Sequence, residues 1–136
     1  MRTALVTGAS SGLGASSAEA LAAQGFSVNG TSRAGGRFRP LDVRDARSVE
    51  ACVASLDRLD LLVNNAGVLL RGSLEETRDE EARAVFDTNY FGVVRVTRAA
   101  LPHLRAARGR VINVGSIACG NAAPLIGHYA ASKHAP

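Results

Sequence analysis

The stretch that decides the fold is Thr7-Gly8-Ala9-Ser10-Ser11-Gly12-Leu13-Gly14. Before it, Thr3–Val6 is apolar or β-branched, as expected of a buried strand. After it, Ala15–Gln24 is rich in alanine, and Gly25 fits the end of a helix. Phe26–Gly30 has the composition of a second short strand. These segments predict a βαβ unit with a right-handed crossover.

Glycines between a strand and a helix let the backbone approach a pyrophosphate, and the first N–H groups of the helix face the anion. The spacing of Gly8, Gly12 and Gly14 differs from the common Gly-x-Gly-x-x-Gly dinucleotide fingerprint. The alternative is a glycine-rich turn that binds no ligand. We expect a nucleotide to contact these loop residues: Gly8, Ser10, Ser11, Gly12, Leu13 and Gly14.

The single lysine of the chain lies in His128-Tyr129-Ala130-Ala131-Ser132-Lys133. Tyr129 and Lys133 stand four residues apart and would share one face of a helix. A phenol has a pKa of about 10, and a nearby ammonium favours its ionised form. Such a phenol can exchange a proton with a carbonyl or an alcohol near neutral pH. A Tyr-x-x-x-Lys pair is common by chance, but here it follows a glycine-rich nucleotide loop.

With these motifs the chain resembles the Tyr-Lys subgroup of the short-chain dehydrogenase/reductase family. Five motifs match in order, across essentially the whole chain. They are Thr7-Gly8-x-x-x-Gly12-x-Gly14, Asn64-Asn65-Ala66-Gly67, Asn89 in Thr88-Asn89-Tyr90-Phe91-Gly92, Ser116 after Val111-Ile112-Asn113-Val114-Gly115, and the pair Tyr129 and Lys133. Taken alone, Ser116 could be a turn serine and Asn89 an ordinary helix residue. In this order and spacing, such readings are improbable.

The resemblance implies an α/β fold, a Rossmann-type doubly wound parallel sheet with about five strands in the order 3-2-1-4-5. It also implies that Tyr129 is the acid/base, that Ser116 hydrogen-bonds the substrate oxygen, and that Lys133 holds the cofactor ribose and lowers the pKa of Tyr129. Asn89 would position a water that links Lys133 to solvent. The segment Asn65, Ala66 and Gly67 would brace the sheet and lie along the cofactor.

The activity implied by this resemblance is hydride transfer between NADP(H) and a small alcohol or carbonyl substrate. Such a reaction needs hydrogen-bond donors aimed at the developing alkoxide and a proton source within reach. Within the family, Tyr129-Ala130-Ala131-Ser132-Lys133-His134-Ala135 looks most like steroid, retinol and general carbonyl reductases.

The end of the second predicted strand, Val28–Arg33, indicates which nicotinamide nucleotide binds. An acidic residue there would bind the ribose hydroxyls of NAD, whereas an arginine accommodates the extra phosphate of NADP. No Asp or Glu occurs between this strand and Asp42, and Ser32 and Arg33 can donate to a phosphate. We therefore expect a preference for NADP(H), with NAD(H) as the alternative if Arg33 is a solvated loop residue. Asp42 and Val43 resemble the family's pair beside the adenine ring.

The remaining pattern predicts the other elements of the sheet. Pro102 should kink the long helix or mark its last turn. The predicted elements are a strand stub over Arg37–Leu41, a helix over Ala46–Leu56, a strand over Leu59–Asn64, a helix over most of Glu80–Arg105, and a strand over Val111–Val114.

Composition limits the class of protein. The 136 residues suffice for one domain, an NAD(P)-binding domain spanning residues 1–136, and the net charge is +4. The arginines are scattered, so we expect no nucleic-acid partner. Cys52 and Cys119 show no metal spacing and should be free thiols, and the three histidines form no ligand set, so we expect no metal. With no apolar leader and no membrane-length apolar run, we expect no membrane contact and a cytoplasmic location.

The family's members are typically longer than this chain. Relative to them, strands six and seven and the substrate loop would be absent, which leaves a truncated fragment or a non-catalytic nucleotide-binding module as the alternative function. The fifth strand would then be an apolar sheet edge, and such an edge invites association. We therefore expect the isolated chain to be marginally stable, and a homo-oligomer is left open.

Overall fold

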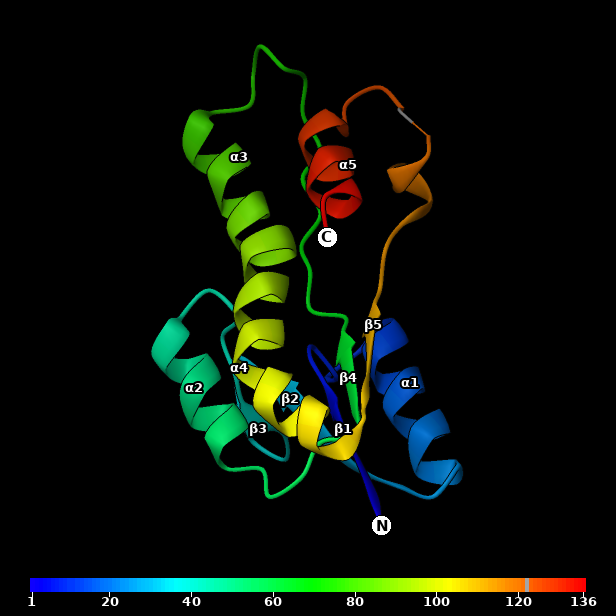
Figure 1. The fold of residues 1–136 in the computed structure, drawn as a ribbon. Coiled ribbons are helices and arrows are strands. Elements are labelled where there is room, and N and C mark those ends of the chain that lie inside the picture. Colours follow the sequence, from blue (N-terminus) through cyan, green and yellow to red (C-terminus); the bar gives the residue numbers. More distant parts are fainter. Residues whose placement is uncertain (122) are drawn as a thin grey trace.

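A computed structural model describes residues 1–121 and 123–136 of the chain. Its centre is one parallel sheet of five strands in the order β3-β2-β1-β4-β5, as predicted (Figure 1). The strands are β1 Arg2–Val6, β2 Phe26–Ser32, β3 Arg39–Pro40, β4 Leu61–Asn64 and β5 Arg110–Asn113. The strand order reverses between β1 and β4, and this is the point at which open α/β sheets bind ligands.

Helices cover both faces of the sheet. Figure 1 shows α1 on one side and α2 and α4 on the other, with α5 beyond the carboxyl ends of the strands. The helices are α1 Gly12–Ala23, α2 Ala46–Ala54, α3 Asp79–Phe86, α4 Gly92–Ala107 and α5 Gly127–His134, with a π-helical turn η1 at Asp87–Phe91 and a 3-10 turn η2 at Ile117–Cys119.

Alternating side chains of the central strands divide the core in two. Leu5 and Leu62 pack into a cluster with residues of α2 and α4, while Ala4, Val6 and Val63 pack into a second cluster with residues of α1. Because successive side chains of a strand point to opposite faces, a continuous apolar strand is what a sheet covered on both sides requires. This explains why β1 is apolar without alternation.

Most predicted boundaries differ from the structure by one to three residues, and two of the differences have a physical reason. The first helix begins at Gly12 rather than at Ala15, because the glycines that the sequence assigns to the loop form the first turn of α1. The helix predicted over most of Glu80–Arg105 continues two residues further, to Ala107, so Pro102 lies before its last turn. Proline removes one bond to the carbonyl of Arg98, and since both residues lie on the exposed face, water can replace that bond.

The strand β5 forms one edge of the sheet, as expected. All four of its residues are exposed, and the side chains include Val111 and Ile112, which are 38% and 49% exposed. On this strand the sheet therefore presents both apolar side chains and unpaired backbone groups to solvent. Among the described residues, no helix is long and apolar enough to cross a membrane.

Candidate active site

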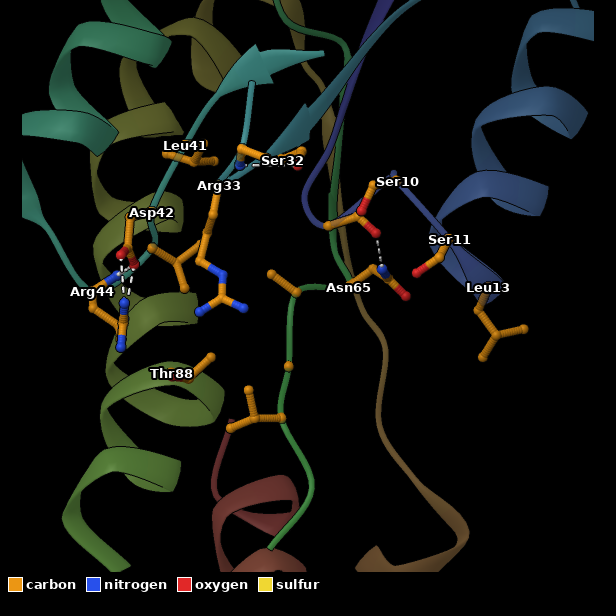
Figure 2. Close-up of a pocket in the computed structure, with 16 residues that line it drawn as sticks. Ser10, Ser11, Leu13, Ser32, Arg33, Leu41, Asp42, Arg44, Asn65 and Thr88 are labelled. Carbon is orange, nitrogen blue, oxygen red and sulfur yellow. Dashed lines mark hydrogen bonds and ion pairs between the residues drawn. The ribbon is translucent and has the colours of Figure 1, made fainter. Parts of the chain in front are cut away.

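A pocket of about 540 Å³ opens at the carboxyl ends of β1, β2 and β4. It gathers the predicted nucleotide-binding residues from segments far apart in the sequence (Figure 2). The predicted residues that line it are Gly8, Ser10, Ser11, Leu13, Ser32, Arg33, Asp42, Val43, Asn65, Ala66 and Gly67. The lining residues that the sequence did not single out for the pocket are Ala34, Leu41, Arg44, Val68 and Thr88.

Close packing requires two of the three loop glycines, Gly8 and Gly14. Gly8 has a φ of +65°, and a Cβ placed there would lie 3.0 Å from the Cα of Ala66. A Cβ on Gly14 would overlap the carbonyl oxygen of Gly8 and Nδ2 of Asn65. Gly12 and Gly14 do not line the pocket; the absence of a side chain at Gly14 lets α1 start directly against the loop.

Two side chains brace this loop against the end of β4. The buried hydroxyl of Thr7 accepts hydrogen bonds from the backbone N–H groups of Asn65 and Ala66, at 3.0 and 2.9 Å. In return, the side-chain amide of Asn65 donates to the carbonyl oxygens of Thr7 and Gly8, both at 3.0 Å. Asn65 thereby holds the glycine loop in place.

The far end of the pocket carries three charged side chains. Arg44 donates through its backbone N–H and Nε to one carboxylate oxygen of Asp42, both at 3.0 Å, and through a terminal nitrogen to the other at 2.7 Å. Hydrogen bonding by Arg44 lowers the pKa of Asp42 from 3.8 to about 2, and Arg33 adds a smaller electrostatic contribution. Figure 2 shows Arg33 reaching into the pocket, between this pair and Asn65.

Asn89 lies in the π-helical turn and is 1% exposed. Its side-chain oxygen accepts from the backbone N–H of Val68 at 2.8 Å, and its amide donates to the Val68 carbonyl at 2.9 Å. The same amide donates to Oγ of Ser132 at 3.0 Å. One buried side chain thus ties the wall of the pocket to α5.

The helix α5 carries Tyr129 and Lys133. The ammonium of Lys133 donates to the carbonyl of Val114 at 2.6 Å, and burial lowers the pKa of this lysine. A Cβ on Gly67 would lie 3.7 Å from Nζ of Lys133, so the lysine stands beside the pocket wall. Within residues 1–121 and 123–136, the Tyr129 hydroxyl makes no hydrogen bond, although the tyrosine is half-buried.

Ser116 follows β5 at the same edge of the sheet. Its Oγ accepts from the backbone N–H of Ala118 at 3.2 Å, which leaves its hydroxyl hydrogen available. The thiol of Cys119 accepts from the Ser116 N–H at 3.2 Å and donates to the carbonyl of Lys133 at 2.9 Å. Cys119 therefore joins the serine turn to α5.

The structure thus separates the predicted residues into two groups. Asn89, Ser116, Tyr129 and Lys133 do not line the pocket but belong to the elements next to it. Ser132 and Cys119, which join these elements, were not predicted to have a role. Ser132 had one available signal, since it is a small polar residue on the helix that carries Tyr129 and Lys133. In the described part of the chain, no group of three His, Cys, Asp or Glu residues could hold a metal ion.

Comparisons with known proteins agree with this geometry. The model of the short chain dehydrogenase family matches residues 2–136. The chain is 42% identical to the 3-ketodihydrosphingosine reductase of Bacteroides thetaiotaomicron, over 96% of this chain and 53% of that protein. It is 36% identical to the 3-oxoacyl-(acyl-carrier-protein) reductase FabG of Escherichia coli, over 97% of this chain and 62% of that protein. It therefore spans little more than half the length of these curated relatives.

Solved structures give the same result. An alcohol dehydrogenase from the archaeon Thermococcus sibiricus, complexed with 5-hydroxy-NADP, matches with a TM-score of 0.94 and 29% identity, over 99% of this chain and 66% of that one. The NADH-dependent reductase A1-R', complexed with NAD, matches with a TM-score of 0.91 and 31% identity, over 98% and 67%. Since a family model covers almost every residue and relatives above 30% identity cover nearly the whole chain, the protein belongs to the short-chain dehydrogenase family.

Proposed function

We propose that the protein is an oxidoreductase that transfers a hydride between NADP(H) and an alcohol or carbonyl substrate. The observation that carries this proposal is the hydrogen-bonded connection from Val68 in the pocket wall, through Asn89, to Ser132 on α5. It sets a nucleotide-sized pocket beside a helix with a tyrosine and a lysine, as the chemistry of hydride transfer requires. Binding and proton transfer then occur at adjacent places.

The residues present fit a nicotinamide dinucleotide. Gly8 has a left-handed backbone and lines the pocket, and α1 starts directly against the loop because Gly14 has no side chain. Backbone N–H groups at the start of α1 can bind a pyrophosphate there. Lys133 has three N–H donors and uses one for Val114, so two could reach ribose hydroxyls. Ser32 and Arg33 would take the 2′-phosphate, which supports a preference for NADP(H) over NAD(H).

In this proposal the bound nicotinamide supplies the hydride chemistry. The Ser116 hydroxyl donates a hydrogen bond to the substrate oxygen, and Tyr129 delivers a proton to that oxygen or removes one from it. Lys133 holds a positive charge near the tyrosine from the next turn of the same helix. The part of Asn89 in a proton relay stays a prediction. Its side chain is already hydrogen-bonded to Val68 and Ser132.

The proposed substrate class rests on the reactions that the names of the relatives denote, and not on a substrate pocket. The named relatives are a ketodihydrosphingosine reductase and an oxoacyl reductase, and both names denote ketone reduction. We therefore include ketones of long or acyl-type chains, beside general carbonyl compounds, among the substrates to test. The two free thiols, Cys52 and Cys119, support a cytoplasmic location, and the exposed β5 supports self-association.

The test begins with titration of the chain by NADPH and by NADH, followed through nicotinamide fluorescence. NADPH consumption with a panel of ketones comes next. Replacing Tyr129 by Phe should lower turnover by about 10²–10⁴-fold, because general acid–base catalysis is lost, while NADPH binding stays unchanged. Tyr90→Phe is the matched control, since it removes a hydroxyl from the other tyrosine of the chain and should leave turnover unaffected.

Equal turnover by Tyr129→Phe and the unaltered chain would contradict the role of this tyrosine. Nucleotide binding without turnover on any ketone would favour a nucleotide-binding module. Failure to bind either nucleotide would contradict the proposal as a whole.

A further inference from the structure

Arg44 was not predicted to take part in the site, yet it lines the pocket. It contacts both oxygens of Asp42 with three hydrogen bonds of 2.7–3.0 Å. Paired donors from one guanidinium to a carboxylate form a geometrically specific contact. Figure 2 shows the pair on one wall of the pocket, opposite the loop that carries Ser10 and Ser11.

Arg33 is in a different situation. It is exposed at the end of β2, and its side chain makes no hydrogen bond or ion pair with any residue of the described chain. It nevertheless stands near enough to Asp42 to affect that carboxylate electrostatically. In the absence of Arg44, Asp42 would be the nearest pocket-lining acid for Arg33 to bind.

The charged side chains at this end of the pocket do not cancel. Among the residues that the structure describes, Asp42 is the only acidic one that lines the pocket, while Arg33 and Arg44 line it with positive charge. Asp87 also faces Arg44 electrostatically, but its carboxylate is paired with Arg95 at 2.7 Å. The pocket end therefore has one positive charge in excess, and that charge is located on Arg33.

We propose that Arg44 is a positioning residue for nucleotide selection: by occupying Asp42, it leaves Arg33 available for the 2′-phosphate of an adenine nucleotide. The inference rests on the proposed function, since it concerns the adenosine half of the same cofactor. It goes beyond that function by assigning the selectivity to three side chains, of which Arg33 binds the phosphate, Asp42 is the competitor and Arg44 neutralises the competitor.

The probes are adenosine 2′,5′-diphosphate and adenosine 5′-monophosphate, which differ only in the 2′-phosphate. Isothermal titration calorimetry of the 136-residue chain measures the ratio of their affinities. We expect the unaltered chain to prefer the diphosphate, and Arg33→Gln to abolish the preference. Arg44→Gln should lower the affinity ratio about tenfold, as expected when a charged pair near a phosphate is rearranged.

The decisive variant combines Arg44→Gln with Asp42→Asn. Removing the carboxylate releases Arg33 again, so the double variant should recover most of the preference. Because both probes are measured on the same sample of a variant, partial unfolding of that sample does not change the ratio of their affinities. A purely structural effect of Arg44 would not be reversed by a second substitution in its partner.

Three results would overturn the inference. An unchanged ratio in Arg44→Gln would show that Asp42 does not compete for Arg33. A lowered ratio that the double variant fails to restore would show that Arg44 contacts the phosphate itself. A chain that binds neither probe would lack the phosphate site altogether. Failure of the proposed oxidoreductase function has a different signature, because selective binding would persist without any turnover of NADPH.

Discussion

The glycine-loop end of the site and the Tyr129 end differ in how far the chain satisfies its own polar groups. At the loop, Thr7 and Asn65 exchange hydrogen bonds across the ends of β1 and β4. At the other end, Lys133 contacts one carbonyl, and the described residues offer Tyr129 no partner for its hydroxyl. The chain itself braces the glycine loop with reciprocal hydrogen bonds, whereas the Tyr129 hydroxyl has no such partner among the described residues.

Charge is also affected in opposite ways at the Tyr129 end and at the end of the pocket that faces the glycine loop. The ion pair with Arg44 favours the charged form of Asp42, whereas burial disfavours the charged form of Lys133. Active sites often retain such unfavourable groups because function requires them. The contrast suggests that substitutions at the loop end affect folding and binding together, while those at the Tyr129 end affect chemistry with little effect on folding.

The largest effect on stability is expected for Gly14→Ala. The added Cβ would overlap the Gly8 carbonyl and the Asn65 amide, and backbone cannot move aside cheaply. We expect a loss of about 3 kcal/mol in the free energy of unfolding, in the range of overpacked cores, and loss of nucleotide binding. Urea denaturation and NADPH titration measure the two effects.

The matched control for that substitution lies at the Tyr129 end. Gly120 follows η2 with a φ of −111°, and a Cβ there would contact nothing within 4 Å. Gly120→Ala should change the free energy of unfolding by less than about 1 kcal/mol. If both variants lost equal stability, the proposed difference in packing between the two ends would be wrong.

A second, smaller effect sharpens the comparison at Thr7. Thr7→Val keeps the shape of the side chain but removes the acceptor for two half-buried N–H groups, which should destabilise the fold by about 2 kcal/mol. Thr7→Ser keeps the hydroxyl and should lose less than half of that. Ser116→Ala, at the other end, should have the smaller cost of one half-buried bond. A Thr7→Val protein as stable as the Thr7→Ser protein would count against the brace.

The smallest effects are those of pH. Because the folded pKa of Asp42 lies below 3.8, its contribution is present above that pH and is lost as the pH falls through about 2. For Lys133, the unfolded chain binds more protons just below pH 10.5, so stability should rise with pH there.

Each titration is expected to change the free energy of unfolding by less than about 1 kcal/mol, since the groups are partly exposed. Asp42→Asn should flatten the acid side and Lys133→Met the alkaline side, as measured by urea denaturation across pH. If the free energy of unfolding rose more steeply with alkaline pH in Lys133→Met than in the unaltered chain, the sign assigned to this lysine would be wrong.

Much of the fold follows from local pattern. The apolar run before Gly8, the glycine spacing and the alanine-rich segment predicted the first βαβ unit, and the family resemblance predicted the strand order. The helix boundary at Gly12 was missed because glycine is a poor helix former. At Gly14 only the close contact with Asn65 and the Gly8 carbonyl, which is a tertiary property, explains the use of glycine. The sequence left two roles open for Pro102, a kink or the last turn of the helix, because the solvent exposure that lets the helix continue past it is a tertiary property.

The sequence predicted those residues of the site that belong to recognisable motifs. The pocket contains Arg33, Asp42 and Asn65, which sequence reasoning named. Arg44 follows Asp42 and Val43 directly, but its pairing depends on a turn that returns its side chain to Asp42. Ser132 is fully buried because Asn89, 43 positions earlier, packs against it, and no local pattern reports such a contact.

The π-helical turn at Asp87–Phe91 has a consequence for insertions and deletions. It lies inside one uninterrupted helical run from Asp79 to Ala107, and it is wider than an α-helical turn. A one-residue deletion there could be absorbed by closing the turn into an ordinary α-helix. The helix would survive, but Asn89 would be shifted away from Val68 and Ser132. Chain length at this turn therefore distinguishes homologues that retain the tie from those that retain only the scaffold.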